Sequence, residues 1–126
     1  GVKLLVWNSS GFILPVKIGN PSLDVRIDIA SYLEQSGLPY IIIQPSVYAE
    51  NLLGPWTAPF VKNEGIVTYP TPEEMPIGWI ATQDVANLVA QAIVSPHLAG
   101  QSFQVSGIEN LTGNQLADKF SIGLGK

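Results

Sequence analysis

The stretch LPYIIIQPSVYAEN, residues 38–51, contains a short β-branched run that stops at Pro45. Residues 40–43 show no alternation of polar and apolar side chains and are too few for a helix. They therefore predict a strand that is buried on both faces of a parallel sheet. Ligands of open α/β sheets bind just beyond the carboxyl ends of such strands. We expect a site at the residues that end or follow this strand: Pro45, Ser46, Val47, Tyr48 and Asn51.

The residues before this strand complete a strand, helix, strand unit. Residues 2–7 predict a first buried strand, and the small residues 8–11, Asn-Ser-Ser-Gly, allow a tight turn after it. Asn20 is a candidate N-cap with Pro21 in the first helical position, and the helix is expected to run to residue 36 and stop at Gly37. The spacing of about 40 residues is that of a βαβ unit with a right-handed crossover.

A proline-rich segment follows. Residues 54–80 contain five prolines, which exclude a long helix there and indicate a loop-rich insertion with a short strand at residues 66–69. Thr82 is then expected to cap a helix that Pro96 ends. The apolar face of this helix carries Val85, Leu88, Val89, Ala92 and Ile93.

The last segment predicts one more strand and one more helix. Residues 102–106 alternate, with Phe103 and Val105 inward, and Thr112 with Gln115 forms a capping box for a helix that Gly123 ends. The element order predicts an α/β fold with a mostly parallel sheet and flanking helices. Four strands are fewer than a doubly wound sheet usually carries. We therefore expect the chain to be a single, partial domain of a larger protein.

Composition excludes several classes of protein. The chain has 126 residues, a net charge of −4 and only 13% charged residues, against about 25% in a typical soluble domain. Its six basic residues are scattered, so we expect no nucleic-acid partner. The absence of Cys excludes disulfides and thiolate metal sites. No apolar run reaches the length of a membrane span, and we expect a cytoplasmic protein without a membrane partner.

Familiar catalytic motifs are missing. There is no G-x-G-x-x-G phosphate loop and no G-x-S-x-G elbow, and the one histidine, His97, is expected in a surface turn. Asp84 lies at the start of a predicted helix, where the helix dipole stabilises a carboxylate, so a structural role is favoured over a catalytic one. The remaining carboxylates indicate a solvated helix face and a loop tip and not a metal site. They are Asp24, Asp28, Glu73 and Glu74.

Arg26 breaks the pattern of the first helix. At about 100° per residue, Asp24 and Asp28 fall on the polar side, with Ser31 and Gln35, while Arg26 falls at the centre of the apolar face. The residues expected on that apolar face are Leu23, Ile29, Ala30 and Leu33. A guanidinium aimed at a core is costly unless it is paired. Two interpretations stay open: a structural pairing with Asp24, Asp28 or a loop carboxylate, and contact with an anion or substrate in a cleft.

Three segments jointly resemble one family. They are SGLPYIIIQPSVYAENLLGPW (residues 36–56), PIGWIATQDVANLVAQAI (76–93) and AGQSFQVSGIENLTGNQLADKFS (99–121). This pattern is similar to that of the NmrA-like, atypical short-chain dehydrogenase/reductase proteins. The resemblance implies a Rossmann-like fold that binds NAD(P)H, with this chain supplying the later half of the doubly wound sheet and lacking the glycine-rich first half.

The resemblance also assigns site residues. Asn8, Ser9, Pro45, Ser46 and Val47 would line the nicotinamide end of the cofactor site. Tyr48, Asn51 and Trp56 would face the substrate, although Tyr48 and Trp56 are also candidates for plain core packing. Arg26 falls where reductases of this family place a lysine that can relay a proton.

Two features depart from the family pattern. Gln44 replaces the arginine often found before Pro45, and no tyrosine is followed four residues later by lysine. Arg26 remains charged at any ordinary pH, so it is suited to orient a carbonyl but not to act as a general acid. The proton donor is therefore not identified from the sequence.

Two functions are consistent with this pattern. The first is an NAD(P)H-dependent reductase of a small carbonyl, quinone or enone-type acceptor, with Arg26 orienting that acceptor. The second is a non-catalytic NAD(P)-sensing regulator. We also expect a protein partner or self-association through uncovered sheet edges, because an unpaired strand edge is a template for pairing.

Overall fold

The computed structural model describes residues 1–125, which form two compact units. Unit 1 comprises residues 1–46 and 83–105, and unit 2 comprises residues 47–82 and 106–125. The boundary falls directly after Pro45 and Ser46, within the stretch that was expected to carry the site. Each unit is described separately below.

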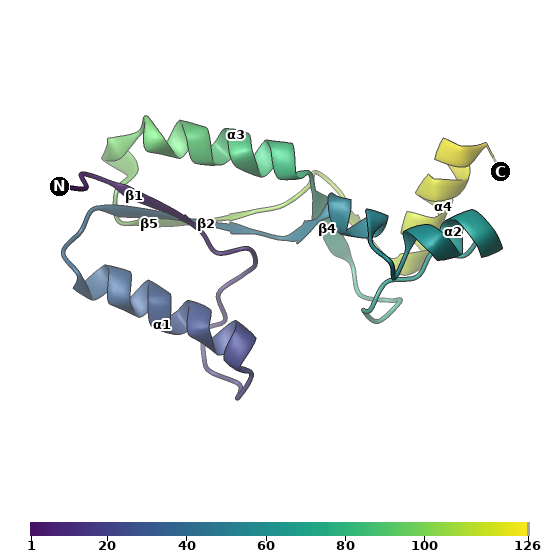
Figure 1. The fold of residues 1–126 in the computed structure, drawn as a ribbon, viewed down its shortest axis with the longest axis horizontal. Helices are drawn as coiled ribbons and strands as arrows, with labels where there is room; N and C mark the ends of the chain where they lie inside the picture. The colour runs from purple at the N-terminus through teal and green to yellow at the C-terminus, as the bar shows by residue number, and fades with distance from the viewer. Residues whose placement is uncertain (126) are drawn as a thin grey trace. The chain divides into compact units, whose positions relative to one another are not determined.

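Unit 1 is an α/β layer structure built on a parallel sheet (Figure 1). Its strands are β1 (Leu5–Asn8), β2 (Tyr40–Pro45) and β5 (Gln101–Val105), in the order β1-β2-β5. The helices α1 (Pro21–Gln35) and α3 (Thr82–Ile93) cover opposite faces of the sheet, and the short helix η2 (Pro96–Leu98) follows α3. The prediction of a mostly parallel α/β fold is confirmed.

The core of unit 1 centres on the β-branched run. Ile41, Ile42 and Ile43 are buried because α1 and α3 cover both faces of the central strand. Leu33 of α1 and Val85 of α3 are buried on these two helices. The strand reaches Pro45, as predicted, whereas β1 begins at Leu5 and not at residue 2.

The ends of α1 follow the sequence signals. The Asn20 side chain accepts a hydrogen bond from the backbone N–H of Ser22, Pro21 is the first helical residue, and Gly37 has a left-handed φ of 71°. The predicted polar face is wrong at Asp24, which is buried. Its carboxylate accepts hydrogen bonds of 2.9 Å from the backbone N–H groups of Ile18 and Gly19, because the loop before α1 folds back over the first turn of the helix.

The apolar face of α1 is also narrower than predicted. Leu33 is buried and Leu23 and Ala30 are half-buried, but Ile29 is 38% exposed. The half-buried residues Leu23, Ile27 and Ala30 lead to Leu33 along a stripe of helical spacing. Ile29 lies at the margin of that stripe, which explains its exposure.

Unit 2 is built from short elements. Strand β3 (Val47–Tyr48) is parallel to β4 (Ile77–Ile80), and β4 is antiparallel to β6 (Asn110–Leu111). The helices of this unit are η1 (Ala49–Leu53), α2 (Ala58–Glu64) and α4 (Gly113–Leu124).

The proline-rich segment differs from the prediction. Residues 66–69 do not form a strand. Two side-chain hydrogen bonds fix this segment instead: the Thr57 hydroxyl donates to the carbonyl of Thr68, and the Thr68 hydroxyl donates to the carbonyl of Trp56. A short helix, α2, forms despite the prolines, since Pro59 lies in its first turn, where no N–H donor is needed.

The capping box of α4 is confirmed, and its predicted end is wrong. Thr112 and Gln115 exchange both hydrogen bonds of the box. The helix continues through Gly123 to Leu124, because the left-handed conformation that ends it is adopted by Gly125, with φ of 67°.

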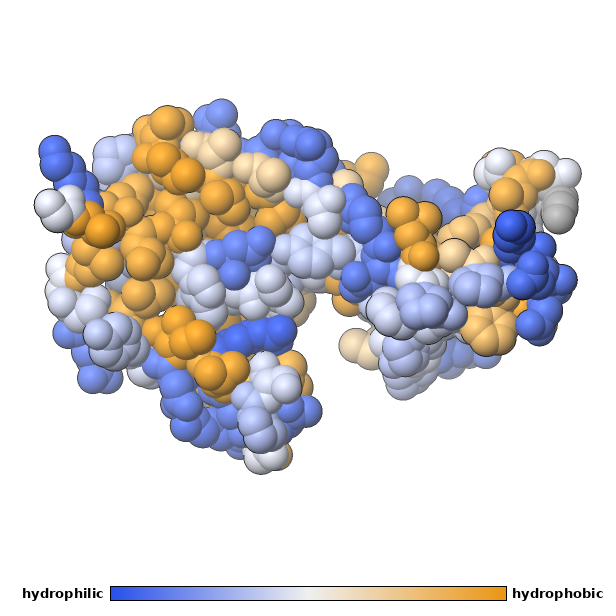
Figure 2. All heavy atoms as spheres, viewed as in Figure 1, coloured by the Kyte–Doolittle hydropathy of each residue, from blue (hydrophilic) through white to orange (hydrophobic). Residues whose placement is uncertain are grey.

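Strand β1 is an edge strand of the unit 1 sheet, and the expected self-association would use such an edge. Among the strands of residues 1–125, β1 pairs with β2 alone. Figure 2 shows hydrophobic residues gathered on this side of unit 1, between α1 and α3. Pairing of this edge with another chain stays a prediction.

No helix in the described residues is long and apolar enough to cross a membrane.

Candidate functional site

The loop after β1 forms a compact turn at the carboxyl edge of the unit 1 sheet. The buried Ser9 donates its hydroxyl to the carbonyl of Gly11 at 2.6 Å, and its backbone N–H donates to the carbonyl of Ile43. The Asn8 side chain accepts from the N–H of Ser10, which has a φ of 52°. The hydroxyl of Ser9 therefore holds the loop, so any part it takes in cofactor binding would be to fix the shape of this edge.

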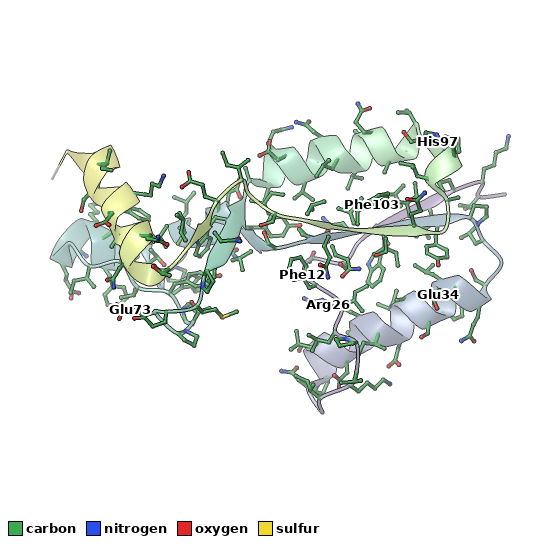
Figure 3. All side chains as sticks on the ribbon, turned by 180° about the vertical axis from the view of Figure 1, so that it is seen from behind. Phe12, Arg26, Glu34, Glu73, His97 and Phe103 are labelled. Atoms are coloured by element: carbon green, nitrogen blue, oxygen red, sulfur yellow. The ribbon has the colours of Figure 1, made fainter. Side chains whose placement is uncertain are left out.

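Arg26 reaches this loop from α1. Its guanidinium donates to the carbonyl of Ser10 at 3.2 Å, and Figure 3 shows it beside Phe12. It also packs on Gly11, where an added Cβ would lie 2.9 to 3.1 Å from the guanidinium atoms. The flexible guanidinium could shift away from such a Cβ, whereas the φ of 151° at Gly11 is a backbone conformation that favours glycine.

Of the two interpretations of Arg26 left open, pairing with a carboxylate is wrong within the described residues. Asp24 binds backbone N–H groups, and Asp28 forms an ion pair of 2.5 Å with Lys17. Arg26 donates to a neutral carbonyl, and no carboxylate of residues 1–125 forms an ion pair with it. The alternative interpretation, contact with an anion or a polarised carbonyl, stays a prediction.

The end of β2 lies at the same edge of the sheet. Asn8 is opposite Ile43 in β2, and Pro45, which is fully buried, is opposite Val105 in β5. The backbone N–H of Ser46 donates to the carbonyl of Val105 at 2.8 Å. The structure thus gathers Asn8, Ser9, Pro45 and Ser46 at the carboxyl ends of the unit 1 strands, and Arg26 of α1 contacts the loop after β1 there.

Gln44 is a residue whose role the sequence did not reveal. Its side-chain carbonyl accepts from the backbone N–H of Ile13 at 2.8 Å, and its amide donates to the hydroxyl of Ser102 at 2.6 Å. It therefore ties the loop after β1 to the far strand β5. The available signal was a polar side chain at the end of an otherwise apolar strand.

The other predicted residues belong to unit 2. Val47 and Tyr48 form β3, opposite Trp79 and Ile80 of β4. The Asn51 amide donates to the hydroxyl of Tyr69 at 3.3 Å. Trp56 is 44% exposed and lies against Gly54, so it does not fill a core.

Glu50 is a further residue that sequence reasoning missed. Its carboxylate accepts from the hydroxyl of Thr82 at 2.7 Å and from the backbone N–H of Thr82 at 3.0 Å. It thus caps the start of α3, where Thr82 itself was expected to cap. The hydrogen bond from the Thr82 hydroxyl, helped by backbone N–H groups, lowers the pKa of Glu50.

We expect this contact to make stability depend on pH. Because the pKa of Glu50 is lower in the folded state, its contribution is fully present above the unfolded-state pKa and is lost as the pH falls through the folded-state pKa. Urea denaturation from neutral to acidic pH checks this: wild type should exceed Glu50→Gln in stability at pH 7, and the difference should shrink on acidification. A difference that does not change with pH would contradict the assignment.

The titratable residues form no metal site in the described part of the chain. No group of three or more His, Cys, Asp or Glu residues is close enough there to hold an ion. His97 is exposed, as predicted, and Figure 3 shows it at the end of α3 that is far from Arg26. Asp84 is an exposed residue in the first turn of α3, consistent with the structural role favoured for it.

Comparison with known proteins gives one family match. A sequence model described as the NmrA-like family matches residues 1–126. Photosystem II assembly factor Ycf39 from Synechocystis is 29% identical over 87 residues, 69% of this chain and 26% of that protein. NAD(P)H azoreductase from Xenophilus azovorans is 28% identical over 94 residues, 75% of this chain and 32% of that protein. The chain therefore spans between a quarter and a third of the length of these relatives.

Solved structures match over nearly the whole chain. A nucleoside-diphosphate-sugar epimerase from Staphylococcus aureus has a TM-score of 0.71 at 23% identity, covering 98% of this chain and 42% of that one. UDP-glucose 4-epimerase from Thermotoga maritima has a TM-score of 0.73 at 18% identity, covering 99% and 48%. At these identities the likeness shows the fold alone, which is Rossmann-like, as the sequence predicted.

Proposed function

The chain belongs to the NmrA-like family, and from this premise we propose that the protein binds NAD(P)H and reduces a small carbonyl, quinone or enone-type acceptor. The observation that carries the proposal is the carboxyl edge of the unit 1 sheet, where Asn8, Ser9, Pro45 and Ser46 gather and Arg26 approaches the loop after β1. The relative named NAD(P)H azoreductase supports the same chemistry.

The residues of this edge suit the nicotinamide end of such a cofactor. Their side chains are short, and the hydrogen bond from the Ser9 hydroxyl to the carbonyl of Gly11 keeps the turn after β1 compact. Residues 1–126 contain no G-x-G-x-x-G motif for the pyrophosphate. We propose that a segment outside these residues holds the phosphates, in keeping with relatives that are about two to three times as long.

Arg26 would bind the acceptor. The bound cofactor supplies the hydride, and the protein contributes by holding donor and acceptor in line. The guanidinium is permanently charged, so it can stabilise negative charge on the acceptor oxygen but cannot donate the proton. Its contact with Ser10 fixes it at the loop and leaves its charge available. Tyr48, Asn51 and Trp56 remain our proposed substrate contacts.

The test is turnover by the full-length protein with NADPH or NADH and a panel of quinones, enones and azo dyes, followed by cofactor absorbance. Arg26→Ala should lower kcat/KM by about tenfold to a hundredfold, the range expected when a charged hydrogen bond is lost. Arg26→Lys should retain part of the activity. As a control, Lys17→Ala removes an exposed cation paired with Asp28 and should change kcat/KM by less than about twofold.

A non-catalytic NAD(P) sensor is the second candidate. It is favoured by the missing Tyr-x-x-x-Lys pattern and by relatives whose names describe assembly and differentiation rather than catalysis. It predicts tight cofactor binding, no turnover on the whole panel, and a protein partner whose affinity changes when the cofactor is added. Turnover that depends on Arg26 would exclude it.

A further inference from the structure

Unit 2 contains a pocket that none of the predicted site residues lines. Its volume is about 340 Å³, within the range of small-molecule sites. It is formed by the segment before β4, by β4 itself and by the start of α4. Met75, Ile77 and Leu116 give it an apolar lining from all three parts.

Two aromatic rings form one side of this pocket. Tyr69 and Trp79 both line it, with ring centroids 4.8 Å apart and planes at 83° to each other. Perpendicular rings of this kind favour further aromatic contacts, and the nearby Met75 thioether also packs well on a ring. The lining therefore suits a flat, unsaturated body.

The indole nitrogen of Trp79 has no hydrogen-bond partner. It is the one buried side-chain nitrogen or oxygen without a partner in residues 1–125. A buried donor left unpaired costs about 1–3 kcal/mol, so such groups call for an explanation. Trp79 lines the pocket while its indole nitrogen is buried, so the N–H reaches a ligand only if the ring rotates about χ2, which is a soft torsion.

The charges around the pocket disfavour an anionic ligand. Glu73 is the single charged residue in the lining, and Figure 3 shows it beside the start of α4. Two of the nearby N–H groups of α4 are already used: Gly113 donates to the carbonyl of Glu73, and Gln115 donates to Thr112. A phosphate or carboxylate would meet Glu73 without a compensating cation.

We propose that this pocket binds a neutral, flat ring compound with one hydrogen-bond acceptor, which pairs with the indole N–H of Trp79. None of its lining residues is among those proposed to bind the cofactor or acceptor, although Asn51 donates a hydrogen bond to the hydroxyl of Tyr69 in its wall. Binding there does not require turnover. Failure of the reductase proposal would therefore leave this one standing, and the reverse also holds.

The experiment compares three probes on the ¹⁵N-labelled full-length protein: 1-tetralone, tetralin and 1-naphthoate. They share a two-ring body, but only tetralone is neutral with an acceptor. The Trp79 indole signal is identified as the one lost in Trp79→Phe. Tetralone should shift this signal downfield and bind about fivefold to tenfold more tightly than tetralin, the gain expected of one hydrogen bond. Naphthoate should bind at least about tenfold more weakly than tetralone.

Three variants separate the pocket from other surfaces. Trp79→Phe should remove the preference for tetralone over tetralin while keeping tetralin binding. Ala117→Leu places a larger side chain in the pocket and should weaken both by about tenfold or more, whereas Ala86→Leu, at an exposed position of α3, should change neither. Equal binding of tetralone and tetralin, an unmoved Trp79 signal, or tetralone binding that survives Ala117→Leu would each overturn the proposal.

Discussion

Replacing Gly107 with alanine is expected to destabilise unit 2 by about 3 kcal/mol or more. A Cβ at this position would lie 2.0 Å from the backbone carbonyl oxygen of Trp79 and 2.9 Å from its carbonyl carbon. Backbone atoms cannot rotate aside as a flexible side chain can. The segment after β5 would therefore have to move away from β4, which would loosen the pairing of β4 with β6.

Gly78 shows the same close approach from the other side. A Cβ there would lie 1.8 Å from the hydroxyl of Ser106. Two glycines thus allow residues 106–107 to cross β4. The loss of stability in Gly107→Ala therefore comes from the clash with β4. It does not come from backbone strain, because Gly107 has no left-handed φ.

Gly123→Ala is the matched control. Gly123 lies inside α4 and nothing comes within 4 Å of an added Cβ, so alanine should stabilise the helix by about 0.5–1 kcal/mol. Urea denaturation of the full-length protein, followed by far-UV circular dichroism, measures both variants. A Gly107→Ala variant as stable as wild type would show that the crossing is looser than described.

Unit 1 could be predicted because its signals are local. The Asn20-Pro21 start of α1 and the run of three isoleucines each determine their element within a few residues. A strand with these isoleucines buried on both faces needs a helix on each side of the sheet. This arrangement defines the α/β class. The family resemblance agreed with this result and was confirmed over residues 1–126.

Unit 2 was predicted less well because its strands are too short to leave a pattern. Strands β3 and β6 have two residues each, and β4 has four. The segment at residues 66–69 has the β-branched composition of a strand, but hydrogen bonds involving Thr57 and Thr68 replace strand pairing there. Such side-chain contacts with the backbone depend on the tertiary fold and are not visible as periodicity.

For the candidate site, too, local signals could be predicted from the sequence and tertiary contacts could not. Helical spacing correctly marked Arg26 as unusual, but its partner is a carbonyl 16 residues earlier. Gln44 and Glu50 contact residues 31 and 32 positions away, at Ile13 and Thr82. Partners at this separation are brought together by the fold, so residue type alone identified candidates without identifying what they bind.

Ile41→Ala is expected to destabilise the protein by about 2–5 kcal/mol, the range for truncating a fully buried large aliphatic side chain. Ile41 is 0% exposed and lies in the central strand, opposite Val6 of β1 and Gln101 of β5. Its loss leaves a cavity that the sheet cannot close, because strands on both sides fix the backbone. Alanine also has a lower preference for strands than isoleucine.

Two further variants make this prediction specific. Ile41→Val removes one methylene and should cost about 0.5–1.5 kcal/mol, whereas Ile108→Ala, at a position that is 102% exposed, should stay within about 0.5 kcal/mol of wild type. Urea midpoints compared at equal m-values give all three free energies. If Ile41→Ala cost no more than Ile108→Ala, the central strand would not be the core of unit 1. The edge that carries Pro45, Ser46 and the loop contacted by Arg26 would then lack its structural support.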